Sequence, residues 1–191
     1  MRIAILGWGS LLWEGGAEFD RWHEPWQPDG PILKTEFSRV SKTTRLGALT
    51  LVVDEERGSP TTVAWCLSKR RNPEDAICDL RCREGTTIEN IRRIFVASNV
   101  ERREGNDEEN AVAAWARGKR IDVVVWTALE SNFEEETGHP FSVEAVVSYV
   151  KTLTAEGKVK AAEYVWRAPD FVQTPVRTAL QREPWFSPRG N

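Results

Sequence analysis

The sequence predicts an α+β fold in a single domain spanning residues 1–191. Segments rich in β-branched and aromatic residues, typical of strands, occupy most of the first two thirds of the chain, and helix-like segments occupy its end. A length of 191 residues is typical of one domain. With 40% hydrophobic and 29% charged residues, the composition is typical of a globular protein rather than a disordered one.

Several segments have the composition of β-strands, and the first begins almost directly after Met1. It is an apolar run that stops at Gly7 and Gly9, which favours a short buried strand. The turn residues at 58–60 predict a hairpin between the strands on either side of them. The predicted strands cover residues 2–6, 33–40, 48–53, 62–67, 90–97 and 121–129. Gly and Pro at residues 13–31 predict a long irregular loop, and residues 101–110 a charged loop.

Helix-start and helix-stop signals mark the predicted helices. Asn72 suits an N-cap, Pro73 suits the first helical position, and Gly85 suits the stop after Glu84. Ser142 suits the cap of a later helix that reaches about residue 154, with Gly157 ending it. Further helices are predicted at residues 160–167 and 174–181, followed by a polar tail from about residue 184.

Charge and cysteine usage argue against several classes of protein. The formal net charge is −3 and no run of Lys and Arg supplies the one-sided positive field that nucleic-acid binding needs, so a nucleic-acid partner is not expected. No apolar stretch approaches the roughly 20 residues that span a bilayer, and no secretory signal is recognisable, so no membrane partner is expected. Cys66, Cys78 and Cys82 lack the spacing of a disulfide framework, which favours a reducing cytoplasm.

The first candidate site is the loop that follows the first strand, Gly-Trp-Gly-Ser-Leu-Leu at residues 7–12. Its two glycines allow the backbone to turn sharply and to approach a ligand, and successive N–H groups in such a loop can bind a carboxylate. A plain tight turn is the alternative interpretation. The spacing matches neither a dinucleotide-binding fingerprint nor a phosphate-binding P-loop.

The second candidate site is Glu84. On the predicted helix, Ile77, Leu80 and Glu84 lie on one face, which is the apolar one. Burial disfavours the charged form of a carboxylate, and so does the negative end of a helix, so we expect the pKa of Glu84 to be raised. Such a group is suited to general acid–base catalysis near neutral pH. The alternative is a boundary glutamate whose carboxylate reaches water. Asp79 and Arg83 are expected to pair on the solvent side.

Other residues have weaker patterns. Arg39, on a predicted strand, could bind a substrate carboxylate in a bidentate manner, although a solvated arginine is the commoner case. A catalytic triad at Ser10 would have to recruit His23 or His139 across space. Cys78 and Cys82 are expected to be small buried residues rather than zinc ligands.

Nine tryptophans are an unusual feature, and four of them fall within the first 26 residues. Aromatic residues contribute much of the area of most cores, so an apolar core cluster is one interpretation. An aromatic wall over a ligand pocket is the other, and both can hold at once. The four residues are Trp8, Trp13, Trp22 and Trp26.

The two candidate sites coincide with a resemblance to a known family. Residues 7–11 resemble the Tyr-Gly-Ser-Asn/Leu motif of the γ-glutamyl cyclotransferase-like superfamily, with Trp8 where the family usually has Tyr. Residues 80–85, Leu-Arg-Cys-Arg-Glu-Gly, resemble the family segment in which a helix ends at the catalytic glutamate. The order of the remaining elements is similar to about residue 166.

The resemblance implies a mixed, partly closed β-barrel flanked by helices. It also implies release of 5-oxoproline from a small γ-glutamyl substrate without metal or cofactor, because the substrate's own α-amine attacks its γ-carbonyl. Glu84 would be the catalytic acid–base group. Substrate binding would fall to Gly7, Trp8, Gly9, Ser10 and Leu11. A non-catalytic small-molecule binding domain of the same fold is the alternative, and the sequence leaves the oligomeric state open.

Overall fold

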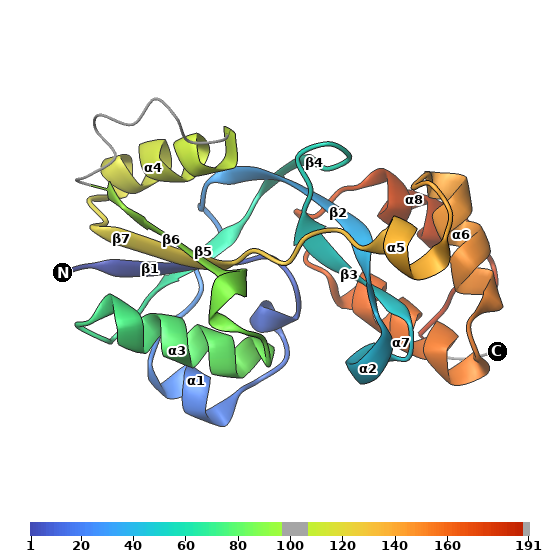
Figure 1. The fold of residues 1–191 in the computed structure, drawn as a ribbon, viewed down its shortest axis with the longest axis horizontal. Helices are drawn as coiled ribbons and strands as arrows, with labels where there is room; N and C mark the ends of the chain where they lie inside the picture. Colours follow the sequence, from blue (N-terminus) through green and yellow to red (C-terminus); the bar gives the residue numbers. More distant parts are fainter. Residues whose placement is uncertain (97–106, 189–191) are drawn as a thin grey trace. The chain divides into compact units, whose positions relative to one another are not determined.

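The computed structural model describes residues 1–96 and 107–188, and its described residues confirm the α+β class (Figure 1). They group into two compact units. Unit 1 comprises Met1–Leu33 with Thr62–Leu129, and unit 2 comprises Lys34–Thr61 with Glu130–Asn191. The chain therefore crosses between the two units three times. The single domain expected from its length stays a prediction.

Unit 1 is built on a mixed four-stranded sheet with the order β5-β1-β7-β6. Strand β1 is parallel to β7 and antiparallel to β5, and β6 is antiparallel to β7. The four strands are Ile3–Gly7 (β1), Ala64–Leu67 (β5), Ile91–Phe95 (β6) and Val123–Thr127 (β7). Every residue of β1 is buried, as expected for a strand covered on both faces. Figure 1 shows helices α3 (Pro73–Glu84) and α4 (Asp107–Lys119) on opposite sides of this sheet.

Helix α3, Pro73–Glu84, has the predicted boundaries. The side chain of Asn72 accepts a hydrogen bond from the N–H of Glu74, and Pro73 opens the helix. Gly85 ends it with a left-handed backbone at φ 59°, a conformation that glycine adopts readily. The core between α3 and the sheet contains Ile3, Ile5, Phe19, Cys66, Ala76, Ile77, Leu80, Ile91, Val123 and Val125.

Residues 13–31, predicted as an irregular loop, contain the short helix α1, Ala17–Arg21, and cover the outer edge of β5. Gln27 and Trp65 exchange backbone hydrogen bonds of 2.7 and 2.9 Å, and Gly30 donates to the Val63 carbonyl at 3.0 Å. Unpaired backbone groups at a sheet edge are a liability in solution. The segment therefore provides hydrogen-bond partners for backbone groups at that edge.

Unit 2 contains a three-stranded sheet with the order β3-β2-β4, packed with short helices. The strands are Ile32–Ser41 (β2), Ala48–Val53 (β3) and Ser59–Thr62 (β4). Helix α7 packs on β3 and helix α6 packs on α8. The helices are Lys42–Arg45 (α2), Phe133–Thr137 (α5), Val143–Thr152 (α6), Ala155–Arg167 (α7) and Pro175–Arg182 (α8).

The predicted hairpin between residues 48–53 and 62–67 is wrong. The second segment is divided: residues up to Thr62 belong to β4 beside β2, and β5 pairs with β1 in the other sheet. Strand β3 pairs with β2 instead. Ala64 and Cys66 are buried, and pairing with the fully buried β1 protects them better than a two-stranded hairpin could.

Two further expectations need correction. Residues 107–110 are not loop but open helix α4, Asp107–Lys119, whereas residues 101–106 of the predicted charged loop lie outside the described residues. Gly157 does not end α6 but lies inside α7, where a Cβ would come within 2.9 Å of the Leu46 carbonyl oxygen. The break comes earlier, because Thr154 caps α7 by accepting from the N–H of Gly157.

The predicted tail also contributes to the packing of unit 2. Phe186 is buried, and the indole of Trp166 donates a hydrogen bond to its carbonyl at 3.2 Å. Within residues 1–96 and 107–188, no helix has both the length and the apolar character that crossing a membrane requires.

We expect Leu80→Ala to lower the free energy of unfolding by about 2–5 kcal/mol, because Leu80 is fully buried and its loss leaves a cavity between α3 and the sheet. Ile88→Ala, at a side chain that is 56% exposed, is the matched control and should cost much less. Urea unfolding followed by tryptophan fluorescence measures both. Equal losses for the two variants would contradict the described position of α3.

Candidate functional site

The loop after β1 forms a short 3-10 turn, Ser10–Leu12, preceded by Gly9. The Gly9 carbonyl accepts from the N–H of Leu12 at 3.0 Å, and the Ser10 carbonyl accepts from those of Trp13 and Glu14 at 3.2 and 2.8 Å. The first N–H groups of such a turn have no acceptor inside it. The loop is thus a tight turn whose opening amides belong to Gly9 and Ser10.

Gly7 is required by a close contact rather than by its backbone conformation. A Cβ at this position would lie 2.8 Å from a ring carbon of Trp26, so the indole lies directly against the backbone where the loop begins. Gly9 has a φ of −118°, which other residues also adopt. Gly7 therefore allows a close approach of an aromatic ring of the same chain, whereas the approach of a ligand to the two glycines stays a prediction.

The early tryptophans contribute to the packing of unit 1. Trp8 is only 6% exposed, and Trp26, together with Leu11 of the loop, packs against the core cluster beneath α3. The Arg70 guanidinium lies over the ring of Trp22, 3.5 Å from its centroid. A core role for Trp8 and Trp26 is therefore confirmed, whereas a wall over a ligand stays a prediction.

Glu84 is the last residue of α3, and its side chain is 19% exposed. It stands in the same unit as the loop, and Ile77 and Leu80 on its helix pack into the core that Leu11 also contacts. The carboxylate is accordingly neither fully in water nor fully in the core. Its Oε1 atom is buried and lies 3.9 Å from Nη1 of Arg83.

Arg83 connects the helix end to the loop, which the sequence did not predict. Its Nη2 donates to the carbonyl of Ser10 at 3.3 Å and to that of Glu14 at 2.5 Å. The expected pair between Arg83 and Asp79 is wrong. Asp79 instead accepts two hydrogen bonds from Arg70, at 2.7 and 2.9 Å, which leaves the Arg83 guanidinium to turn toward the loop.

The described residues give no support to a triad that joins Ser10 to His23, since no hydrogen bond connects them there. His23 lies between the rings of Phe19 and Trp26, with Nδ1 2.6 Å from the Glu24 carbonyl and Nε2 3.5 Å from Asp20. It is held by its own segment. His139 belongs to unit 2.

The cysteines differ from expectation. Cys78 and Cys82 are exposed on α3, not buried, because the apolar face of the helix is formed by Ala76, Ile77 and Leu80 instead. Cys66 is buried, and burial raises the pKa of its thiol. In the part of the chain that the structure describes, no group of three or more His, Cys, Asp or Glu side chains is arranged to hold a metal ion.

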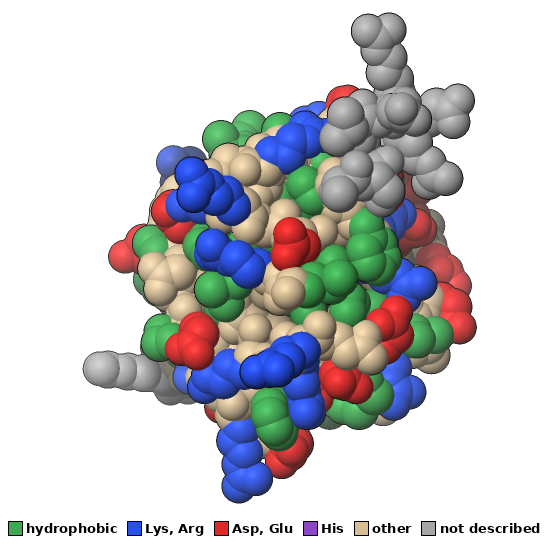
Figure 2. Space-filling model, turned by 90° about the vertical axis from the view of Figure 1, so that its left-hand side faces the viewer, with side chains coloured by type: hydrophobic (Ala, Val, Ile, Leu, Met, Phe, Trp, Pro, Cys, Tyr) green, Lys and Arg blue, Asp and Glu red, His purple; other side chains and the backbone are tan. Residues whose placement is uncertain are grey.

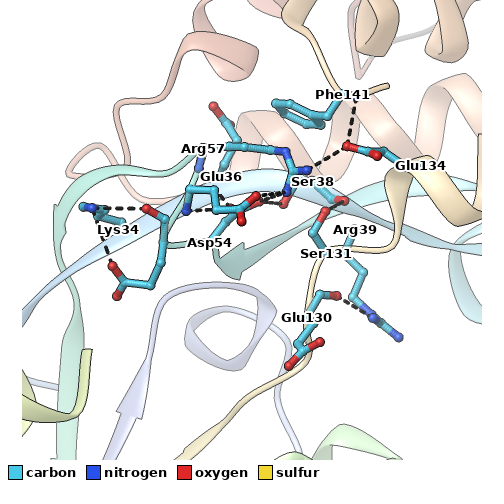
Figure 3. A network of polar contacts seen from close by, with 12 residues as sticks. Lys34, Glu36, Ser38, Arg39, Asp54, Arg57, Glu130, Ser131, Glu134 and Phe141 are labelled. Atoms are coloured by element: carbon cyan, nitrogen blue, oxygen red, sulfur yellow. Dashed lines mark hydrogen bonds and ion pairs between the residues drawn. The ribbon is translucent and has the colours of Figure 1, made fainter. Parts of the chain in front are cut away.

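Arg39 belongs to unit 2, in a network of polar contacts around β2 (Figure 3). Its Nη1 donates to the Glu130 carbonyl at 2.6 Å. Nearby, Ser38 donates to Asp54 at 2.8 Å, and the same carboxylate accepts from the N–H of Arg57 at 3.0 Å. The carboxylate-binding role of Arg39 stays a prediction, and its nearest partner in the structure is a backbone carbonyl.

Glu36 is a buried carboxylate of this network that the sequence did not predict. It is 1% exposed, and it accepts from the N–H of Phe37 at 2.7 Å and from that of Val176, at the start of α8, at 3.5 Å. Burial raises the pKa of Glu36, while hydrogen bonds from Thr174 and the backbone oppose the shift. Its neighbours on both sides are buried as well, so an alternation of buried and exposed positions could not identify Glu36 as a buried residue.

Charges of both signs are interspersed on the face of the molecule shown in Figure 2, with hydrophobic side chains between them. This agrees with a formal net charge of only −3. Comparison with known proteins adds no further evidence, because no protein-family model matches the chain and no curated protein matches it.

We expect Gly7→Ala to destabilise the protein by about 1–3 kcal/mol, because the added methyl group meets the Trp26 ring. The same substitution in a Trp26→Leu background should cost much less, since the smaller side chain gives way. Gly118→Ala, where a Cβ meets nothing within 4 Å, is the control and should be stabilising. Thermal unfolding of the variants measures these costs, and an equal Gly7→Ala cost in both backgrounds would exclude the contact.

The raised pKa of Glu36 predicts a pH-dependent stability. The folded protein binds the proton of the Glu36 carboxyl group more tightly than the unfolded chain does. The stabilisation that this protonation provides is therefore present at low pH. It is lost as the pH rises from about 4, the ordinary pKa of a glutamate, through the raised pKa. The stability of the wild type relative to Glu36→Gln should therefore fall across this range. Urea unfolding at a series of pH values tests it, and a difference that stays constant or grows with pH would contradict the burial of an acid here.

Proposed function

We propose that the chain is a γ-glutamyl cyclotransferase-type enzyme that releases 5-oxoproline from a γ-glutamyl amide, with Glu84 as general acid and base. One observation carries the proposal: Arg83 connects the two segments that resemble the family motifs. Its Nη2 donates a hydrogen bond to the Ser10 carbonyl, and its Nη1 lies 3.9 Å from Oε1 of Glu84. Those segments are 73 residues apart in the sequence. Their proximity supports a common site.

The reaction requires one new bond and one broken bond. The α-amine of the substrate attacks its own γ-carbonyl carbon, closing a five-membered ring, and the bond from that carbon to the leaving amine then breaks. Because both reacting groups belong to one molecule, much of the entropic barrier is already overcome. Glu84 would accept the proton from the attacking amine and deliver it to the leaving amine, so it is regenerated in each cycle.

The loop would bind the glutamyl moiety. The amides of Gly9 and Ser10 open the turn and suit a carboxylate or the oxyanion that forms on the γ-carbonyl oxygen. Trp8 and Leu11 are engaged in packing, so their contribution would come mainly from their backbone. A contact between Arg39 and a substrate carboxylate stays part of the proposal, and in unit 2 its Nη1 donates to the Glu130 carbonyl.

The partly closed barrel of the resembled family is part of this proposal, as is a cytoplasmic location. The exposed thiols of Cys78 and Cys82 are compatible with a reducing compartment. We propose that the enzyme needs no metal or cofactor, since substrate and Glu84 supply every group in the cycle.

We expect purified wild-type protein to release 5-oxoproline from γ-glutamyl amines, γ-glutamyl dipeptides or glutathione, as detected by mass spectrometry. Glu84→Gln keeps the shape of the side chain but removes the base, so activity should fall by about 10²–10⁴-fold. Glu89→Gln, at an exposed glutamate shortly after α3, is the matched control and should keep full activity.

Full activity in Glu84→Gln would refute the assignment of Glu84. A wild-type protein that binds these compounds in calorimetry but yields no 5-oxoproline would instead establish the non-catalytic binding domain. Covalent labelling of Ser10 by a fluorophosphonate, unaffected by loss of Glu84, would identify a serine hydrolase.

A further inference from the structure

We propose that Arg83 is a positioning residue that holds the turn at residues 10–14 against the end of α3 and so sets the place of the loop relative to Glu84. The inference rests on the proposed function for its catalytic consequence. The contact itself, Arg83 with the carbonyls of Ser10 and Glu14, is called the Arg83 clamp.

The clamp holds both ends of one turn. The two N–H groups of a single guanidinium nitrogen, Nη2, reach the carbonyls of Ser10 and Glu14. The Ser10 carbonyl also accepts from the amides of Trp13 and Glu14, so the cation adds to hydrogen bonds that already define the turn. The Arg83 side chain is only 13% exposed, and hydrogen bonds to a charged donor are stronger where water is excluded.

The Arg83 side chain packs against Gly16, where a larger residue would collide with it. A Cβ at Gly16 would lie 2.7 Å from Cδ of Arg83 and 3.0 Å from its Nε. The backbone at Gly16 has a φ of −135°, which any residue adopts, so its lack of a side chain matters for space and not for conformation. A methyl group there should displace the guanidinium without removing its charge.

The same guanidinium faces both parts of the proposed site. Nη2 is bonded to the loop, while Nη1 lies 3.9 Å from Oε1 of Glu84. Because Arg83 and Glu84 are neighbours at the end of a rigid helix, fixing the turn to Arg83 also fixes its place relative to the Glu84 backbone. A displacement of about 1 Å between reacting groups can cost a factor of about 10² in rate.

The test compares Arg83→Met, Arg83→Lys and Gly16→Ala with Arg81→Met as the matched control. Arg81 lies two residues away on the same helix, and its Nη2 contacts Cys82 Sγ at 3.5 Å rather than the loop. We expect kcat for 5-oxoproline release to fall about 10²-fold in Arg83→Met while KM changes less. Arg83→Lys and Gly16→Ala should lie between that variant and the wild type, and Arg81→Met should match the wild type.

Chemical rescue separates positioning from loss of fold. Ethylguanidinium added to Arg83→Ala should restore part of its kcat, because the small cation can occupy the vacated space, whereas Arg81→Ala should not respond. Circular dichroism first confirms that each variant is folded. A folded Arg83→Met with the kcat of Arg81→Met would overturn the proposal.

Hydrogen exchange keeps the clamp distinguishable from the proposed function. The amides of Leu12, Trp13 and Glu14 are protected by the turn, so they should exchange faster in Arg83→Met and Gly16→Ala than in Arg81→Met. Unchanged exchange would overturn the clamp whether or not the protein is an enzyme. If the wild type forms no 5-oxoproline, the catalytic consequence falls with the function, while faster exchange would still establish the clamp.

Discussion

The packing of α3 against β1 and β7 fixes the geometry of unit 1. Ile77 and Leu80 are buried against these strands, so the end of the helix cannot shift without opening the core. Strand β1 leads directly into the loop, and Leu11 returns to the same core. The core thus brings the loop and the helix end into the same region, and the proposed Arg83 clamp then fixes the turn relative to Glu84.

Features that local signals determine could be predicted from the sequence. The boundaries of α3 follow from a cap at Asn72 and a left-handed stop at Gly85, both of which act within a few residues. Strands β1 and β7 are short apolar runs that fit only a buried position. The α+β class follows from the order of such segments. The two candidate segments were likewise visible because each departs from a local pattern.

Features that depend on competition between distant partners could not be predicted. Asp79 could pair with Arg83 on the same helix or with Arg70 before it, and only the folded chain shows that Arg70 takes it. Residues 64–67 could pair with β1 or with β3, and only the folded chain shows that they pair with β1. Glu36 lies among buried neighbours, and its partners at the start of α8 are about 140 residues away.

Two buried ionisable side chains elsewhere in the chain have hydrogen-bonding groups that match the helix ends they face. Arg177 donates to three carbonyls just after α7, at Ala168, Pro169 and Val172, and Glu36 accepts from an N–H at the start of α8. A cation at the carbonyl end of a helix stabilises the fold, as does an acceptor that faces the amides at a helix start.

Glu84 has the opposite arrangement, because its carboxylate belongs to the last turn of α3, where the carbonyl groups give the helix its negative end. Stability alone does not explain a partly buried acid there. Residues that break a local rule in an otherwise consistent fold are expected at functional sites. This mismatch, together with the loop that Arg83 contacts, is the physical reason for proposing Glu84 as the catalytic group.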